Sequence, residues 1–330
     1  PRRRVHRIHR KEATRLRNFA ALTRMRIQIA FRNKMFFFFV IVMPLVFFFL
    51  YAGVFAKSVP RIVSFYLGPV LAFNVMGSFW GLSATLVMFR EQGILRRFHV
   101  APVTAADLLA SSIVANYVLT LPIVILELVL ARVIFHVPSL GNPVTLFCLI
   151  SIGILSFGSL GLVVASVTNT MQETQVLNQL LWLPLIFLSG ATFPLAYLPR
   201  TVQRFGLFLP ATYLVNGLQQ TVVNSATPWS RYVEILSLSV WALLTFFLSA
   251  QLFRWEPEAK VPRRAKLLVA ATAIPFLLLG VAENMSDRVL REAHTAFENF
   301  TSVPSSPRPP SLGMPAKPPA GGNPAGGRAN

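Results

Sequence analysis

Cysteine is almost absent from this sequence, because Cys148 is the only one in 330 residues. A single cysteine excludes a disulfide framework and a cysteine-based metal cluster within one chain. The histidines are few and scattered, without a carboxylate at metal-binding spacing: His6, His9, His99, His136 and His294. We therefore expect no metal site on this chain.

Motifs of catalysis and nucleotide binding are missing as well. No G-x-x-x-x-G-K-[ST] segment occurs anywhere, so this chain cannot hold nucleotide phosphates by that route. Ser189 and Gly190 stand together, but they break an apolar run and do not form a nucleophile elbow. These absences predict a chain without catalytic residues and without a cofactor of its own.

Charged residues are scarce, at 13% of the chain, whereas 54% of the residues are hydrophobic. A water-soluble domain does not have this composition. A membrane-spanning helix needs about 20 apolar residues. Six runs of about that length or more follow one another: Met35 to Ala56, Ile62 to Phe89, Leu108 to Leu126, Val133 to Gln172, Thr174 to Pro199 and Ile235 to Phe253. The run from Val133 contains Pro138, Gly141, Asn142 and Pro143, so we expect a helix end, a short turn and a new helix there. The sequence therefore predicts an all-α polytopic membrane protein with six spans.

A seventh apolar run, Leu267 to Ala282, is shorter and contains Pro275, so it is a possible extra span. Residues 301–330 contain eight prolines and five glycines, a composition that cannot form a core. We expect four parts: a basic arm with an amphipathic helix at 1–33, the spans at 34–255, a basic linker with the possible seventh span at 256–300, and a disordered tail at 301–330.

Basic residues outnumber acidic residues by 31 to 12, but they gather on alternate loops. Twelve lie within residues 1–34, and others follow the second and sixth runs. The positive-inside rule then places the N-terminus and the loops at 90–107 and 254–266 in the cytoplasm, in a plasma or inner membrane. The positive charge is explained by this topology and by anionic lipid head groups, so we expect no nucleic-acid partner.

The N-terminal basic stretch also has a helical apolar pattern. Between Ala13 and Ala30, apolar residues recur with arginines between them. Such a helix is expected to lie along the cytoplasmic membrane surface with its apolar side down.

The loop after the second run, FREQGILRRFHVAP at 89–102, carries an unusual set of residues. Glutamate can accept and arginine can donate bidentate hydrogen bonds, and glycine lets a backbone approach closely. This pattern predicts a docking surface for a soluble partner, formed by Arg90, Glu91, Gly93, Arg96 and Arg97. The alternative is a plain positive-inside loop. The turn at 168–173 is a weaker second contact through Glu173, or only a helix cap.

A second motif interrupts the chain at membrane depth after the fifth run. Backbone that is broken there must be covered by protein or face water. We expect short re-entrant helices from Pro194 to Asn224 on the outer side, which act as a gate. The gate residues are Ser189, Gly190, Phe193, Pro194, Pro199 and Pro210. The alternative is a looped outer domain without a transport role.

Together these two segments resemble the ABC-2 type permeases, the membrane subunits of type V ABC exporters. The family has an E-x-G-x-L-x-R pattern followed by a proline, which here is Glu91 to Arg97 with Pro102 behind. It also has S-G-x-x-F-P with further prolines, which here is Ser189 to Pro194. The resemblance covers about residues 12 to 254. The family often has Thr where Ile94 stands, and most members end after six spans.

The resemblance implies an exporter subunit that works with a separate ABC ATP-binding subunit, which carries ATP and Mg. In the family that subunit docks on the N-terminal helix and on the loop after the second span. The resemblance also implies a second permease, identical or different, with the substrate path between the two. Polar and aromatic residues of the second and fifth helices are then expected to line the path, with helix packing as the alternative: Phe73, Asn74, Phe79, Asn178 and Gln179. A hydrophobic or amphipathic substrate fits the apolar spans.

Glu127 keeps a different class of function open. A carboxylate within a span is costly unless it is paired or hydrated, and it can relay protons. The alternative to the exporter is therefore a secondary, ion-coupled transporter that uses Glu127, although no internal repeat supports it. Five residues separate Glu127 from Arg132, so the two do not share a helix face well. A channel, a membrane enzyme or a scaffold is favoured by no motif.

Overall fold

The computed structural model describes residue 17, residues 19–29, positions 32, 38, 42, 45, 46, 49 and 50, and the ranges 61–95, 104–253 and 263–301. Residues 19–29 are helical and are called the N-terminal helix here. The named elements are α4 (Arg61–Glu91), α6 (Ala105–Val133), α7 (Pro143–Val167), α8 (Met171–Leu188), η2 (Leu195–Tyr197), α9 (Arg200–Gly206), α10 (Pro210–Asn224), η3 (Trp229–Arg231), α11 (Tyr232–Leu252), α12 (Arg263–Ser286) and α13 (Arg288–Thr301). The described part contains no strand, as the all-α prediction expects.

Within the described residues, four helical stretches are long and apolar enough to cross a membrane: α4, α6, α7 and the stretch Trp229–Leu252 that contains α11. They coincide with the second, third, fourth and sixth predicted runs, which makes this a multi-pass membrane protein. The fifth run corresponds to α8, whose first half is rich in polar side chains. The first run, Met35 to Ala56, lies outside the described residues except for a few positions, so the six-span count stays a prediction.

The helix boundaries follow from local capping. Thr104 and Asp107 form a capping box at the start of α6, in which each side chain accepts a hydrogen bond from the other residue's backbone N–H. The Asn142 side chain accepts from two backbone N–H groups at the start of α7, and Pro143 occupies the first turn. Helix α7 therefore begins after the Pro and Gly turn that interrupts the run from Val133.

The centre of the bundle is formed by α4, α7 and α10. Their buried side chains make one apolar cluster that includes Leu71, Phe157 and Leu214. Glycine permits the closest approach, because a Cβ on Gly161 of α7 would lie 2.5 Å from the Phe79 carbonyl oxygen of α4. Helices α4 and α7 therefore pack backbone against backbone at this position.

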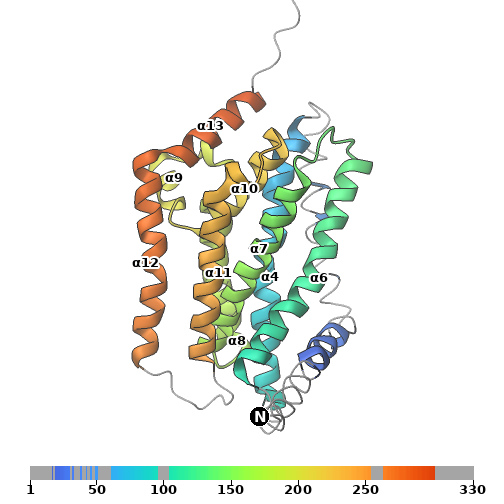
Figure 1. Cartoon of the computed structure of the whole chain (residues 1–330), viewed down its shortest axis with the longest axis vertical. Helices are drawn as coiled ribbons and strands as arrows, with labels where there is room; N and C mark the ends of the chain where they lie inside the picture. Colours follow the sequence, from blue (N-terminus) through green and yellow to red (C-terminus); the bar gives the residue numbers. More distant parts are fainter. Residues whose placement is uncertain are drawn as a thin grey trace, which may run out of the picture.

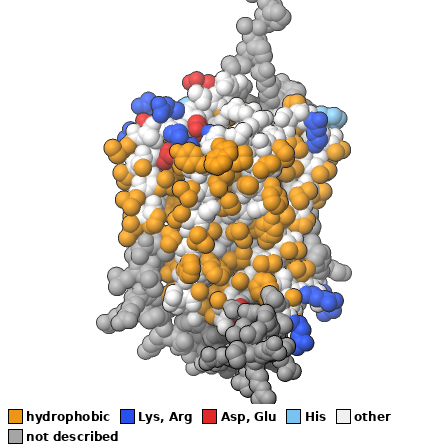
Figure 2. Space-filling view, in the orientation of Figure 1, with side chains coloured by type: hydrophobic (Ala, Val, Ile, Leu, Met, Phe, Trp, Pro, Cys, Tyr) orange, Lys and Arg blue, Asp and Glu red, His pale blue; other side chains and the backbone are white. Residues whose placement is uncertain are grey.

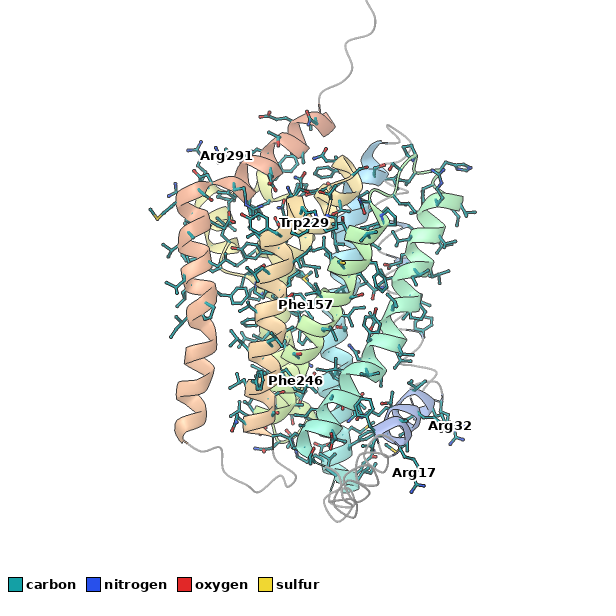
Figure 3. All side chains as sticks on the ribbon, viewed as in Figure 1. Arg17, Arg32, Phe157, Trp229, Phe246 and Arg291 are labelled. Carbon is teal, nitrogen blue, oxygen red and sulfur yellow. The ribbon has the colours of Figure 1, made fainter. Side chains whose placement is uncertain are left out.

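The bundle has two different ends (Figure 1). The N-terminal helix and the end of α4 lie at one end, and α9, α10 and α13 lie at the other. Arg17 and Arg32 mark the first end, and Trp229 and Arg291 mark the second (Figure 3). Between them the face of the molecule that Figure 2 shows is mostly apolar. In keeping with the positive-inside prediction, we call the end with the N-terminal helix the inner end and the opposite end the outer end.

The seventh apolar run is observed within helix α12, which runs beside α11 through the height of the bundle (Figure 1). Trp241 of α11 and Phe276 of α12 pack edge to face with ring centroids 4.6 Å apart. Helix α13 then crosses the outer end, where Val289 and Ala293 are buried against Leu207 and Tyr213. The predicted division left 256–300 as a linker with a possible span, so α13 is an element that the division missed.

Candidate functional site

Arg90, at the inner end of α4, forms hydrogen bonds to the end of α7. Its side chain is only 3% exposed, and Nη1 donates to the carbonyl oxygens of Ala165 and Thr168, each at 2.8 Å. These carbonyls belong to the last turn of α7, where helix backbone needs outside partners. Arg90 therefore ties α4 to α7 and does not present its guanidinium to a partner protein.

The next residue, Glu91, is exposed and reaches the start of α8. Its Oε1 accepts from the backbone N–H of Met171 at 2.8 Å, at a helix N-terminus where a carboxylate is favourable. Glu173 accepts from the N–H of Asn169 at 2.7 Å, and its own N–H donates to Thr170 Oγ1. Both carboxylates thus hold the turn between α7 and α8.

Gly93 ends the helix with a backbone φ of +69°, in the left-handed region that glycine adopts without strain. No atom lies within 4 Å of the position that a Cβ would take there. Arg96 and Arg97 lie outside the described residues.

Arg90 and Glu91 together form what we call the inner clamp. Arg90 binds the end of α7, and Glu91 binds the start of α8. A displacement of the α4 terminus must therefore act directly on the turn between α7 and α8. The loop pattern in the sequence pointed to these residues, but it could not show that Arg90 faces inward.

At the outer end, α8 stops at Ser189, and Gly190 turns the chain with a φ of +92°. The Ser189 hydroxyl is buried and accepts from the N–H of Ala191 at 3.3 Å. Phe193 is exposed and stacks on Phe187, with ring centroids 6.2 Å apart. Prolines then set the following short helices: Pro194 precedes η2, Pro199 precedes α9 and Pro210 begins α10.

The broken backbone between α8 and α10 is satisfied by buried side chains. Gln203 Nε2 donates to the carbonyl of Leu198 at 2.8 Å, and Tyr213 Oη donates to the carbonyl of Leu207 at 2.8 Å. Thr212 Oγ1 likewise donates to the carbonyl of Gly206. These bonds meet the requirement that interrupted backbone at membrane depth be covered by protein.

A network of charged side chains connects the helices at the outer end. The sequence analysis did not predict this network. Glu234 of α11 has no exposed surface, and its Oε1 accepts from Arg288 at 2.9 Å and from Asn216 at 3.1 Å. Glu292 of α13 receives two bonds from Arg231, at 2.6 and 3.1 Å. Arg288 also binds Glu283, at 2.8 Å. The network joins α10, η3, α11, α12 and α13.

The network shifts the pKa of two of its members. Burial alone would raise the pKa of the Glu292 carboxyl, but hydrogen bonds from Arg231 and Asn216 and the charge of Arg288 lower it overall. Burial would lower the pKa of Arg288, but Glu234 and Glu283 raise it overall. Both groups therefore stay charged near neutral pH.

The predicted path residues do not share one surface. Asn178 is fully buried and exchanges hydrogen bonds with Ser83 at 2.9 and 3.2 Å. Phe79 is fully buried, and Phe73 packs on Trp182 with ring centroids 5.0 Å apart. These side chains join α4 to α8.

Gln179 is the exception among the predicted path residues, because it is exposed. Gln172 and Gln175 precede it on the same side of α8 at spacings of three and four residues, and both are exposed as well. Only Thr174, Asn178 and Leu185 of α8 are buried. We call the three glutamines the glutamine stripe. Gln172 lies in the first turn of α8 at the inner end, whereas Gln175 and Gln179 lie further along the helix. Polar side chains at membrane depth rarely face lipid, so these two indicate another protein surface or water.

Glu127 does not pair with Arg132, whose Nη1 donates to the carbonyl oxygens of Val137 and Pro138. Glu127 is fully buried, and Asn74 of α4 faces its carboxyl group. Neither Glu127 oxygen has a hydrogen bond of good geometry within the described part of the chain.

The sequence matches the model of the family described as ABC-2 type transporter over residues 17–223, which is more than half of the chain. The match extends from the N-terminal helix to the end of α10. It therefore contains the inner clamp and the broken outer helices, whereas α12 and α13 lie beyond it.

Individual relatives agree with this match. The chain is 27% identical over 173 residues to the probable multidrug ABC transporter permease YbhS of Escherichia coli K12, covering 52% of this chain and 46% of YbhS. It is 25% identical over 176 residues to the linearmycin resistance permease protein LnrN of Bacillus subtilis 168, covering 52% of this chain and 44% of LnrN. It is 32% identical over 100 residues to nodulation protein J of Bradyrhizobium diazoefficiens, covering 30% and 38%. The aligned part thus spans less than half of each relative.

Proposed function

Because this chain belongs to the ABC-2 type transporter family, we propose that it is the membrane permease subunit of an ABC exporter. A separate ATP-binding subunit, which carries ATP and Mg, would dock at the inner end and drive transport outward. The single observation that carries this proposal is the inner clamp, because it joins the predicted docking loop to α7 and α8. The N-terminus and the loop after α4 then lie in the cytoplasm.

The coupling proceeds through the end of α4. An ATP-binding subunit that binds the exposed Glu91, Gly93 and the following Arg96 and Arg97 moves this terminus when it closes on ATP. Arg90 passes that movement to α7, because its two bonds hold the last turn of α7. Glu91 and Glu173 pass it to the start of α8. Arg90 is thus a transmitting residue within the permease.

A second permease, identical or different, would complete the pathway. The glutamine stripe supports a location of the path beside α8, because the exposed side chains of Gln175 and Gln179 would be costly against lipid. Gln179 keeps its proposed role at the path. The other four predicted path residues are proposed to hold α8 and α6 against α4, and so to position Gln179: Phe73, Asn74, Phe79 and Asn178.

The outer gate is proposed to consist of the break after α8 and the short helices behind it. Ser189 and Gly190 end α8, and exposed Phe193 lies at the mouth. Pro194, Pro199 and Pro210 fix the start of each short helix. When the inner clamp moves α8, the break at Ser189 receives that movement at the other end of the same helix.

The proposed cargo is a hydrophobic or amphipathic small molecule. The names of two relatives refer to multidrug transport and to linearmycin resistance, which supports a drug-like cargo. The side chains on the exposed side of α8 fit such a molecule, because Leu180, Leu183 and Phe187 continue the glutamine stripe with apolar surface.

Co-purification tests this proposal. The tagged chain is extracted from its native membranes in mild detergent, and bound chains are identified by mass spectrometry. We expect an ATP-binding subunit with a Walker motif to accompany the wild type and to be lost with Glu91→Ala plus Arg97→Ala. The matched control is Arg200→Ala plus Arg204→Ala, which removes exposed charges at the outer end and should leave the complex intact. An absence of any such subunit from the wild type would contradict the proposal.

A further inference from the structure

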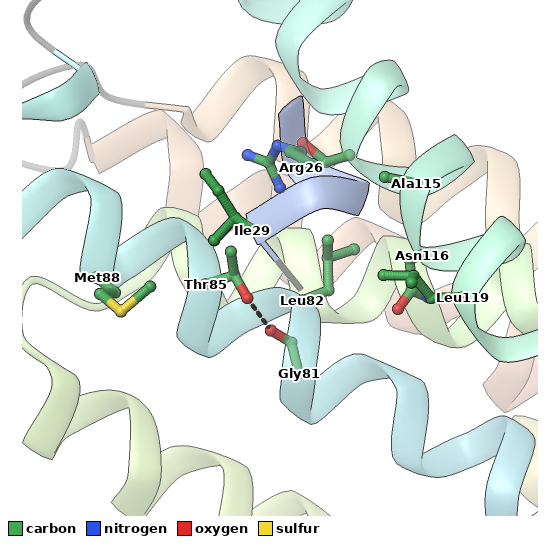
Figure 4. A pocket seen from close by; sticks show the side chains of 10 residues that line it. Arg26, Ile29, Gly81, Leu82, Thr85, Met88, Ala115, Asn116 and Leu119 are labelled. Atoms are coloured by element: carbon green, nitrogen blue, oxygen red, sulfur yellow. Dashed lines mark hydrogen bonds between the residues drawn. The ribbon is translucent and has the colours of Figure 1, made fainter. Parts of the chain in front are cut away.

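A small pocket lies between the N-terminal helix, α4 and α6 (Figure 4). None of its described lining residues belongs to the glutamine stripe or to the outer gate. Its volume is about 60 Å³. A buried water needs about 10–15 Å³, so the pocket admits a compact group of a few atoms. The apolar side chains of Ile29, Leu82 and Leu119 form much of its wall.

Arg26 supplies the charge of this pocket. The sequence pattern placed the arginines of the N-terminal helix between apolar residues, but Arg26 lies on the buried side and is 5% exposed. Its guanidinium carbon lies 5.3 Å from the centroid of the Phe89 ring. That cation–π contact involves the Phe89 ring and no hydrogen-bond acceptor, and the buried Nε and Nη2 have no hydrogen-bond partner among the described residues.

The other polar groups around the pocket add donors and no negative charge. The Asn116 Nδ2 group on α6 is buried and also lacks a partner within the described ranges. Thr85 Oγ1 donates to the carbonyl of Gly81 at 2.7 Å within α4 (Figure 4). None of the described lining residues is acidic. The only acidic residue before Glu91 in the sequence is Glu12.

A buried cation with unused donors requires an anion. Burial lowers the pKa of Arg26 to about 9, so the side chain is still protonated at pH 7. A buried charge without a partner is costly, and charge-assisted hydrogen bonds to a phosphate would offset that cost. The guanidinium fork suits a phosphate group in particular.

The surroundings of the pocket indicate where such a phosphate comes from. Thr85 precedes the inner end of α4 at Glu91 by six residues, or about 9 Å of helix. The adjoining face of α6 is apolar and exposed at Val114 and Val118. An apolar hollow also lies between Val114 and the N-terminal helix, beside Ile27. An acyl chain can therefore lie along α6 while its head group enters the pocket.

We propose that this pocket binds the phosphate of an anionic phospholipid from the inner leaflet, with Arg26 and Asn116 as its donors. The net negative charge matters, because a zwitterionic head group brings its own cation and does not neutralise Arg26. The lipid would fix the N-terminal helix against α4 and α6. This inference does not depend on transport or on an ATP-binding subunit.

Lipid titration of the delipidated full chain in detergent tests the proposal, with bound lipid counted by native mass spectrometry and the unfolding temperature measured in parallel. The probes are phosphatidylglycerol, phosphatidylcholine and inorganic phosphate. We expect phosphatidylglycerol to bind and to raise the unfolding temperature, whereas the other two do not. Arg26→Gln should weaken this binding by about tenfold or more. Arg17→Gln, which removes an exposed arginine at the inner end that lines neither the pocket nor the adjoining hollow, should bind like the wild type.

Two further variants keep the test decisive if Arg26→Gln unfolds the helix. Arg26→Lys keeps the charge but loses the fork, and Asn116→Leu keeps Arg26 but removes a donor. Both should bind phosphatidylglycerol more weakly than the wild type does. Equal binding by Arg26→Lys, Asn116→Leu and the wild type would overturn the proposal. So would equal stabilisation by phosphatidylcholine, and stabilisation by inorganic phosphate alone would assign the pocket to free phosphate instead.

Discussion

The ATP-driven exporter and the ion-coupled transporter assign different roles to Glu127. Its carboxyl group is fully buried beside Asn74 and has no hydrogen bond of good geometry within the described part of the chain. A proton-coupled mechanism needs this group to titrate, whereas the ATP-driven mechanism needs only its packing.

We therefore expect Glu127→Gln, which has nearly the same shape, to leave export by membrane vesicles within about twofold of wild type, because no titration step is lost. The measurement is ATP-dependent drug accumulation in inverted vesicles. A loss of transport together with a normal unfolding temperature would favour the ion-coupled alternative. As a parallel control, a proton gradient is imposed on wild-type vesicles and then abolished. ATP-dependent drug accumulation should continue.

The inner clamp makes a residue-scale prediction about backbone protection. Glu91→Ala removes the acceptor of the Met171 N–H, so hydrogen exchange in peptides covering residues 168–175 should become about fivefold to tenfold faster. Glu91→Gln retains an oxygen acceptor and should stay close to wild type. Unchanged exchange in Glu91→Ala would show that this bond does not hold the start of α8.

At the scale of elements, glycines set how closely α4 meets its neighbours. A Cβ on Gly68 would lie 2.5 Å from the Gln219 Cα and backbone nitrogen of α10. Gly77, nine residues further along the same helix, would meet only the Trp182 ring at 3.8 Å. The same substitution therefore has different consequences at the two positions.

We expect Gly68→Ala to destabilise the protein by about 1–3 kcal/mol, because α10 would have to move away. Gly77→Ala should be neutral or stabilising by up to about 1 kcal/mol, through the higher helix propensity of alanine. Thermal unfolding in detergent compares the two variants. Equal effects at both positions would contradict the observed packing of α10 on α4.

The outer network predicts how α13 is held. Arg288→Ala leaves buried Glu283 without its cation and Glu234 with only the longer contact to Arg231, at 3.5 Å, which should cost about 3 kcal/mol. Arg291→Ala, one turn away and exposed, should cost much less. Limited proteolysis within α13 together with thermal unfolding measures both effects. Comparable losses in the two variants would argue against the network as the fastening of α13.

The same network predicts a dependence on pH. The folded-state pKa of Glu292 is lowered, so its stabilising effect is present above the ordinary glutamate value of about 4.3 and is lost as the pH falls below it. Unfolding temperatures measured from pH 3 to pH 7 should therefore fall at the acidic end. Glu292→Gln should flatten this dependence, and a curve parallel to that of the wild type would contradict the assignment.

Local sequence patterns predicted the elements of the bundle but not its long-range contacts. The runs that became α4, α6 and α7 were visible because spans need continuous apolar residues, and the prolines marked the broken outer helices. Arg231 and Glu292 are 61 residues apart, so their pairing has no local signature. Helix α13 has a readable signal, since Val289, Ala293 and Ala296 recur at helical spacing and are buried, but it is too polar to be found by a search for spans.

At the scale of the whole molecule, the proposed exporter needs a second permease that packs against α8. With Cys148 replaced by serine, a Gln175→Cys variant should form disulfide-linked dimers in native membranes under mild oxidation. Val118→Cys on the exposed face of α6 is the matched control and should remain monomeric. Cross-linking at both positions would indicate random collision, and cross-linking at neither would exclude an identical permease that packs against the glutamine stripe.

ATP hydrolysis by the complex purified through this chain and placed in lipid nanodiscs is the decisive measurement for the proposed exporter. We predict ATP hydrolysis that vanadate inhibits and that is lost when Glu91→Ala plus Arg97→Ala releases the ATP-binding subunit. Purified wild-type protein that binds no ATP-hydrolysing subunit, under conditions that preserve membrane complexes, would contradict the assignment of this chain as an exporter permease.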